Sequence, residues 1–138
     1  MKTPADLLSS EMNAREQAYA PYSGFKVGAS LRGSGGEMFS GCNVENASSE
    51  LTICAECATV FPSVTAGIRT FIQMIVADSV ALCPPCGACR QALFEFASSL
   101  EIWAVNLLGE MKFYRLCDLL SEAFGVDFIP RSNLKQRS

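Results

Sequence analysis

Two short segments that each carry a pair of cysteines constrain the fold of this chain more than any other feature of its sequence. The segments are Cys54-Ala55-Glu56-Cys57 and Pro85-Cys86-Gly87-Ala88-Cys89-Arg90. Both stand at the expected start of a helix, where the unpaired amide N–H groups and the helix dipole favour a thiolate over a thiol. Thiolate is the form that binds metal, so we expect a fold in which the two helix starts face each other around one ion.

Three protein ligands are typical of a catalytic zinc ion, which keeps a fourth position for water. We therefore predict one Zn²⁺ per subunit, bound by Cys54, Cys86 and Cys89. The activated water needs a partner that takes its proton and later delivers it to the leaving nitrogen, and Glu56 has the offset from Cys54 for that catalytic role. Zinc deaminases share this pattern of a metal ligand, any residue, Glu, and then Pro-Cys-x-x-Cys.

Cys57 leaves a second arrangement open. Cys54-x-x-Cys57 together with Cys86-x-x-Cys89 would supply four thiolates, which saturate tetrahedral zinc and leave no position for water. The 28 residues between the two pairs exceed the roughly 15–20 residues of zinc ribbons. We keep this closed, catalytically silent zinc-binding module as the less favoured alternative.

The composition narrows the compartment and the partners. The chain has 138 residues, 49% of them hydrophobic, which is enough for one core. It has no histidine, and its net charge of −3 argues against a nucleic-acid partner. Seven cysteines and the absence of an apolar signal at the start or of a membrane-length apolar run predict a cytoplasmic protein without a membrane partner. Cys42, Cys83 and Cys117 are expected to be small buried side chains.

Hydrophobic periodicity and turn residues predict helices that alternate with strands. The expected helices span 5–20, 54–66, 87–98 and 116–120, and the expected strands span 25–31, 38–44, 70–77, 101–107 and 112–114. This order predicts an α/β fold: a three-layer α-β-α sandwich with one mixed sheet of about five strands. We take residues 1–130 as a single domain and residues 131–138 as a polar C-terminal tail.

From the opening helix to Phe124 the chain resembles the short, homotetrameric, zinc-dependent cytidine deaminase family. Besides the zinc segments, two stretches resemble the substrate-binding segments of that family: Phe25-Lys26-Val27-Gly28-Ala29 and Asn43-Val44-Glu45-Asn46-Ala47-Ser48. The resemblance implies a cytidine deaminase-like fold and a hydrolase that acts on the C–N bond of a cyclic amidine in pyrimidine salvage. It also implies a homotetramer in which neighbouring subunits complete each active site.

The same resemblance implies roles for individual residues. Phe25 would pack against the pyrimidine, Asn43 and Glu45 would bind the ribose 3′-hydroxyl, and the backbone of Ala55 would help read the base. Phe124 would contribute to a site from near the C-terminus. The implied reaction adds water to C4, protonates N3 through Glu56 and releases ammonia, which leaves a uridine-like product.

Three positions depart from the usual pattern of the family. Cys57 stands where an arginine is usual, so the charge of three thiolates would have to be offset by Arg90 and the two helix starts. Ser49 and Glu50 replace a tyrosine and a glycine at the border of the nucleoside pocket. We therefore expect the substrate to be a cytosine nucleoside, with a modified or basic relative preferred over plain cytidine. A deaminase of another amino-heterocycle is the enzymatic alternative.

Overall fold

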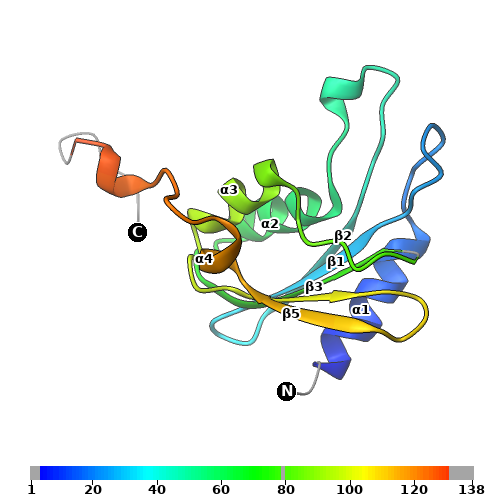
Figure 1. Ribbon diagram of the computed structural model, residues 1–138, viewed down its shortest axis with the longest axis horizontal. Helices are drawn as coiled ribbons and strands as arrows, with labels where there is room; N and C mark the ends of the chain where they lie inside the picture. Colours follow the sequence, from blue (N-terminus) through cyan, green and yellow to red (C-terminus); the bar gives the residue numbers. More distant parts are fainter. Residues whose placement is uncertain (1–3, 79, 131–138) are drawn as a thin grey trace.

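The computed structural model describes residues 4–78 and 80–130. Its centre is a five-stranded sheet with the strand order β2-β1-β3-β4-β5 (Figure 1). The strands are β1 (Gly28–Gly33), β2 (Met38–Cys42), β3 (Phe71–Ala77), β4 (Glu101–Val105) and β5 (Met111–Arg115). β3 and β4 are parallel and the other neighbouring pairs are antiparallel, which confirms the predicted mixed sheet.

Helices cover both faces of this sheet. The helices are α1 (Ala5–Glu16), α2 (Ala55–Thr65), α3 (Gly87–Phe94) and α4 (Leu116–Leu119), and two short 3-10 turns are η1 (Ser49–Leu51) and η2 (Val126–Phe128). α1 lies on one face, and α2 and α3 lie together on the other (Figure 1). The predicted α-β-α layers are therefore confirmed. None of the helices in the described ranges is both long enough and apolar enough to cross a membrane.

Side chains alternate between the two faces of the sheet along each strand, and this alternation gives two separate apolar cores. Leu31 and Met74 face α2 and α3, together with Val60 and Leu93 from those helices. On the opposite face, the second cluster gathers under α1. Its buried members are Leu7, Ile75, Ala77, Trp103 and Val105. Each fully buried leucine or isoleucine contributes about 1.5–3 kcal/mol relative to an exposed one, so both layers hold the sheet in place.

Some elements end earlier than predicted. α1 ends at Glu16 because the chain turns there and Tyr19 then bridges to Val44. The expected strand from residue 25 begins only at Gly28, because the carbonyl of Phe25 and the amide of Val27 bond to the side chain of Asn43. α3 stops at Phe94, where the chain turns back towards β4.

The direction of the strands explains why the two cysteine segments meet. β2 and β3 are both antiparallel to β1, so they run in the same direction and the chain leaves both at the same edge of the sheet. α2 follows β2 and α3 follows β3, and both helices return over the same face. Their first turns consequently lie close together at that edge.

Candidate metal centre and substrate pocket

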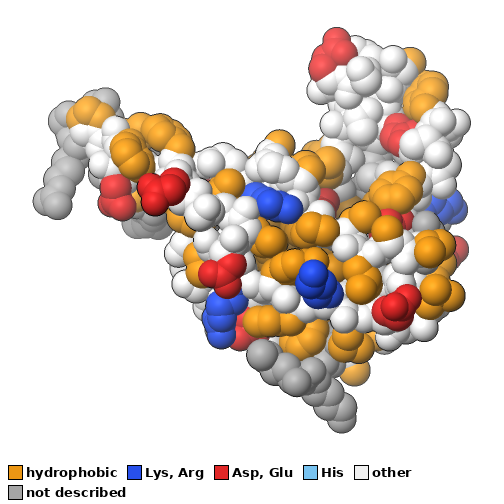
Figure 2. Space-filling model, in the orientation of Figure 1, with side chains coloured by type: hydrophobic (Ala, Val, Ile, Leu, Met, Phe, Trp, Pro, Cys, Tyr) orange, Lys and Arg blue, Asp and Glu red, His pale blue; other side chains and the backbone are white. Residues whose placement is uncertain are grey.

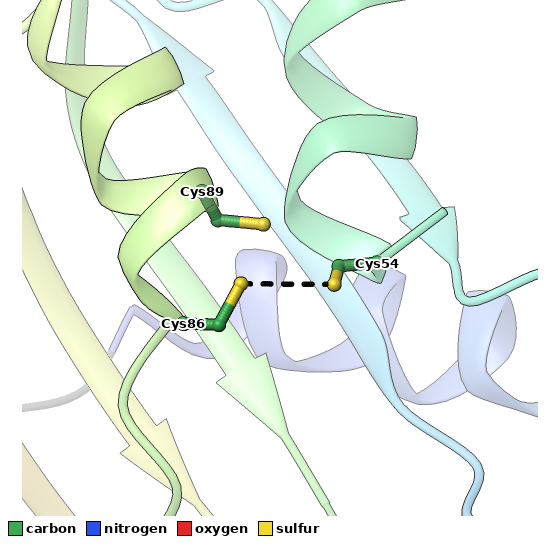
Figure 3. A group of neighbouring side chains, drawn as sticks. All are labelled: Cys54, Cys86 and Cys89. Atoms are coloured by element: carbon green, nitrogen blue, oxygen red, sulfur yellow. Dashed lines mark hydrogen bonds between the residues drawn. The ribbon is translucent and has the colours of Figure 1, made fainter. Parts of the chain in front are cut away.

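Three cysteine sulfurs converge at the facing starts of α2 and α3 (Figure 3). Within residues 4–78 and 80–130, the only such group that could hold a metal ion is Cys54, Cys86 and Cys89, whose Sγ atoms all lie within 4.8 Å of one another. The Sγ atoms of Cys54 and Cys86 are 3.8 Å apart. Zn–S bonds of about 2.3 Å in a tetrahedron place sulfurs about 3.8 Å apart. The group therefore fits one zinc ion per chain.

The local structure favours ionised sulfur. Cys54 is the N-cap of α2, Cys86 is the N-cap of α3, and Cys89 lies in the first turn of α3. Hydrogen bonds from the thiols of Cys89 and Cys86 lower the pKa of Cys54 to about 6. The same bond to Cys54, with burial, raises the pKa of Cys89. The group thus carries negative charge at neutral pH, as a metal ligand set requires.

Cys57 lies beside the group but outside it. Its Sγ atom is 3.3 Å from Sγ of Cys89, a shorter distance than the tetrahedral edge of about 3.8 Å. Burial raises the pKa of the Cys57 thiol. The arrangement fits three thiolates with an open fourth position better than the closed four-cysteine site.

Arg90 is directed away from the sulfurs. Its Nε donates to the carbonyl of Pro85 at 2.7 Å, and its Nη1 donates to the carbonyl of Leu119 at 3.0 Å. The guanidinium therefore ties α3 to the preceding loop and to α4. Of the two sources of positive potential that we expected around the thiolates, the helix starts are the nearer one, because Cys54 and Cys86 are themselves N-cap residues.

A pocket of about 210 Å³ adjoins the metal centre. Its lining residues are Phe25, Val27, Asn43, Thr52, Ile53, Cys54, Ala55, Glu56, Val76, Cys83, Pro84 and Cys86. Glu56 is only 6% exposed, and burial raises the pKa of its carboxyl group. The Sγ atom of Cys89 lies 3.9 Å from Oε2 of Glu56. A protonatable carboxyl group therefore lines the same mostly apolar cavity as Cys54 and Cys86.

Asn43 braces one wall of this pocket. Its Oδ1 accepts a hydrogen bond from the amide of Val27 at 2.9 Å, and its Nδ2 donates to the carbonyl of Phe25 at 2.7 Å. Asn43 is 8% exposed, whereas Phe25 remains partly open to solvent. This side chain therefore fixes the segment that carries the aromatic ring.

Glu45 holds the neighbouring turn. Its Oε1 accepts from the amides of Tyr22 and Ser23 at 3.0 and 3.1 Å, and its Oε2 accepts from the hydroxyl of Ser23. These bonds, with that of the Ser23 hydroxyl the strongest, lower the pKa of Glu45. In the described part of the chain, Glu45 does not line the pocket itself.

Two further residues that the resemblance singled out lie apart from the pocket. Glu50 is exposed on η1, and hydrogen bonds from its own amide and from Ser48 lower the pKa of its carboxyl group. Phe124 is 59% exposed on the segment after α4, where its ring stacks on Phe128 at a centroid distance of 5.8 Å. This segment projects from the body of the molecule, as does the loop that carries η1 (Figure 1).

The pocket also contains residues that the sequence analysis did not assign to it. Cys83 was expected to be a buried small side chain, but it is half-buried and lines the pocket next to Pro84. Its position three residues before Cys86 is the sequence feature that could have predicted a place near the metal centre. The same expectation is wrong for Cys117, which is exposed because one-turn helix α4 buries Leu116 and turns its neighbour outward.

Known proteins are similar to this chain in both sequence and fold. The family described as the cytidine and deoxycytidylate deaminase zinc-binding region matches residues 1–104. A cytidine deaminase of Sporosarcina psychrophila is 42% identical over 120 residues, which cover 86% of this chain and 88% of that protein. The crystal structure of cytidine deaminase from Burkholderia pseudomallei superposes with a TM-score of 0.84 at 42% identity, over 89% of this chain and 100% of that one. For the structure of cytidine deaminase from Mycobacterium tuberculosis, the TM-score is 0.77 at 39% identity, over 88% and 97% of the two chains. The chain therefore belongs to the cytidine deaminase family.

Proposed function

We propose that this protein is a zinc-dependent cytidine deaminase, which converts cytidine or deoxycytidine and water into the uridine-type product and ammonia. The observation that carries this function is the group of three sulfurs within 4.8 Å of one another. The buried carboxyl group of Glu56 lies beside it in the same apolar pocket. Relatives that are 40% identical or more, over most of the chain, are cytidine deaminases.

Cys54, Cys86 and Cys89 would hold the zinc ion, which would supply Lewis-acid activation of the attacking water. Glu56 moves the protons of the reaction. Its carboxylate takes a proton from the attacking water and gives it to N3, which makes the ring a better electrophile. The second proton comes from the hydroxyl group now on C4 and passes through Glu56 to the amino group. The C4–N bond then breaks, ammonia leaves, and the oxygen remains as the C4 carbonyl. A group whose pKa is raised by burial suits both halves of this transfer.

The remaining lining of the pocket positions the base. The walls around Glu56 are mostly apolar, and Phe25, Val27 and Ile53 are among their side chains. Such walls exclude water and accept the faces of a planar pyrimidine. Asn43 fixes the segment of Phe25, and Ala55 places its backbone at the start of α2, where unpaired amides point outward. We assign the ribose to the open side, near Asn43 and Glu45.

Ser49 and Glu50 bear on the choice of nucleoside. The carboxylate of Glu50 is exposed on the projecting loop and keeps its charge, since hydrogen bonds lower its pKa. We propose that this charge favours a cytosine nucleoside with a basic or otherwise modified base or sugar over plain cytidine.

A panel of cytosine nucleosides tests both statements. Zinc-loaded protein is mixed with cytidine, deoxycytidine and base- or sugar-modified relatives, and the loss of amino-pyrimidine absorbance is followed with ammonia release. Turnover of any member supports the deaminase, and faster turnover of a basic relative supports the role of Glu50. Clear superiority of plain cytidine contradicts the preference alone, whereas silence across the panel contradicts the proposed function.

We also propose that the protein works as a homotetramer in which subunits share their active sites. Figure 2 shows hydrophobic side chains spread over the face between the two projecting segments. Exposed large apolar residues on these segments include Leu51, Phe124 and Phe128. A second copy that covers them would bury this surface and bring Phe124 to a neighbouring pocket. The seven free cysteines are consistent with a reducing compartment, and we place the protein in the cytoplasm.

A further inference from the structure

The metal centre concentrates negative charge, and part of that charge lies on buried groups. Three thiolates and one Zn²⁺ carry a net charge of −1, and the carboxyl group of Glu56 adds to it when ionised. Cys89 is 1% exposed and Glu56 is 6% exposed, so water reaches neither of them freely. A buried charge is costly unless hydrogen-bond donors or opposite charges surround it. The buried thiolate of Cys89 therefore needs a hydrogen-bond donor from the protein.

The three sulfurs differ in how far solvent can reach them. Cys86 is exposed and Cys54 is half-buried, and both are N-cap residues, although neither side chain makes a capping hydrogen bond. Cys89 lies further along α3 and is the most buried of the three. In the described ranges no hydrogen bond joins a lysine or arginine to a sulfur, and Arg90 donates to carbonyl oxygens.

A second helix brings a polar hydrogen to Cys89. Cys57 lies in the first turn of α2, across the contact between α2 and α3, and its Sγ is 3.3 Å from Sγ of Cys89. Cys57 is not one of the three ligands, so its sulfur carries an S–H hydrogen that it can donate. A metal-bound thiolate has no proton, so within this pair only Cys57 can donate.

We propose that Cys57 is a positioning residue of the metal centre, whose thiol donates a hydrogen bond to the thiolate of Cys89. The bond would stabilise the zinc-bound state of the three-cysteine group and hold the Cys89 side chain towards the other two sulfurs. The inference rests on the zinc centre of the proposed function and not on which nucleoside is turned over. Hydrogen-bond partners of metal ligands have this effect elsewhere, and their loss typically weakens metal binding about 10- to 100-fold.

The geometry separates this role from that of a fourth ligand. A ligand set of four sulfurs would place all of them at mutual distances near 3.8 Å. Cys57 is instead closer than that to Cys89 and falls outside the group in which every sulfur is within 4.8 Å of the others.

Two substitutions at one position test the proposal. Cys57→Val fills the space but has no donor, and Cys57→Ser keeps a donor that is a poor zinc ligand. Zinc affinity is measured by competition with a chromogenic chelator, and the sulfur-to-metal charge-transfer band is recorded after loading with Co²⁺. We expect Cys57→Val to lose about 10- to 100-fold in zinc affinity. Its charge-transfer band should also shift to lower energy, because the thiolate of Cys89 is no longer stabilised by a donor. Cys57→Ser should recover most of both. Cys117→Ser, at an exposed site, is the control and should match the parent protein.

Each other outcome counts against the proposal. An unchanged band and affinity in Cys57→Val would reduce Cys57 to a packing residue. An equal loss in both variants would show that donation is not the cause. A parent charge-transfer intensity of four thiolates that falls to three in both variants would make Cys57 a ligand. Because none of these readouts uses a nucleoside, they stand even if the substrate panel is silent.

Discussion

Glu56 is a carboxyl group that its surroundings keep out of water, at the end of a pocket beside three sulfurs. Its 6% exposure and its raised pKa both follow from its place in the first turn of α2. Glu56→Gln keeps the size of the side chain and removes its ability to take a proton. We expect the variant to fold and bind zinc as before but to lose turnover by about 10²- to 10⁴-fold, the usual contribution of a positioned proton-transfer group.

Steady-state deamination and zinc content of the purified protein measure that prediction together. Glu16→Gln is the matched control, because it makes the same chemical change at an exposed position of α1. Undiminished turnover in Glu56→Gln would refute the assigned role, whereas loss of zinc in that variant would make its role structural.

For individual residues, the sequence predicts those positions in the site that follow from spacing along the chain. Glu56 follows Cys54 by two residues, so a helix start that holds one also places the other. By contrast, the brace from Asn43 to the backbone of Phe25 and Val27 joins separate segments. The contact of Cys57 with Cys89 also depends on how two helices pack. Such contacts follow from the tertiary structure and have no local signature.

The contact between α1 and β1 depends on the absence of a side chain at Gly28. A Cβ atom there would lie 2.6 Å from the carbonyl oxygen of Glu11 and 2.8 Å from Cβ of Arg15. Because a backbone oxygen cannot turn away, α1 would have to shift. We expect Gly28→Ala to lower the free energy of unfolding by about 1–3 kcal/mol, as overpacking does.

Denaturant unfolding of the purified variants checks this prediction. Gly125→Ala is the control, since its Cβ would meet only Phe94 at 3.5 Å, which is ordinary contact. That variant should stay within about 0.5 kcal/mol of the parent protein. Equal stability of the two variants would contradict the close packing of α1 on β1.

Glu11 makes the same helix contact sensitive to pH. Its side chain is fully buried, and neither carboxyl oxygen has a hydrogen-bond partner among the described residues. Burial raises its pKa to about 7, against the opposing charge of Arg15. The folded protein therefore keeps a proton that the unfolded chain has already lost, so the protonated carboxyl contributes stability at low pH. That contribution is lost as pH rises from about 4.5 through 7, by at most roughly 3 kcal/mol.

The comparison with Glu11→Gln isolates this titration. The neutral amide cannot ionise, so the variant should gain stability relative to the parent protein as pH rises from 5 to 8. Unfolding of both proteins is measured at each pH with zinc present, so that ionisation of the zinc ligands cancels in the difference. A difference that stays constant with pH would contradict the assignment.

Which segments form helices and which form strands was largely predictable, because periodicity and turn residues reflect local chemistry. The residues at which these helices and strands begin and end were less predictable. Residues 25–27 look like a strand by composition, but the amide of Val27 and the carbonyl of Phe25 bond to the side chain of Asn43, and the amide of Phe25 donates to the hydroxyl of Ser23. β5 is longer than the expected strand at residues 112–114, because pairing with β4 extends it to Met111–Arg115.

At the scale of the whole molecule, the order and direction of the strands bring the two cysteine segments together. β2 and β3 run in one direction because each is antiparallel to β1, and the helices that follow them therefore start at one edge. The expectation that the two cysteine segments meet came from their ligand chemistry. The strand order that brings the two segments together depends on contacts between residues far apart in the chain. Local sequence patterns do not predict such contacts.

The two projecting segments are the part of the molecule that we expect to mediate assembly into an oligomer. Their exposed apolar side chains, with Phe124 and Phe128 among them, favour burial against another copy. We expect light scattering to give four chains of 14.9 kDa, about 60 kDa in all. A monomer of full activity would contradict the shared-site assembly.

Co-assembly of two impaired variants locates the shared residue. Glu56→Gln retains Phe124, and Phe124→Ala retains Glu56. If Phe124 serves a neighbouring pocket, subunits that are unfolded and reassembled together should be more active than the mean of the two separate proteins. Activity equal to that mean would place Phe124 outside the neighbour's site.

Titration of the metal-free protein with zinc, with ammonia release from a cytosine nucleoside as the readout, tests the central claim most directly. The three sulfurs of Cys54, Cys86 and Cys89 form one ligand group per chain. Activity should therefore rise with added zinc and stop at one equivalent per chain, while Glu56→Gln binds the same equivalent and stays silent. Ammonia release without zinc, or a protein that takes up its zinc and deaminates no cytosine nucleoside, would contradict the account.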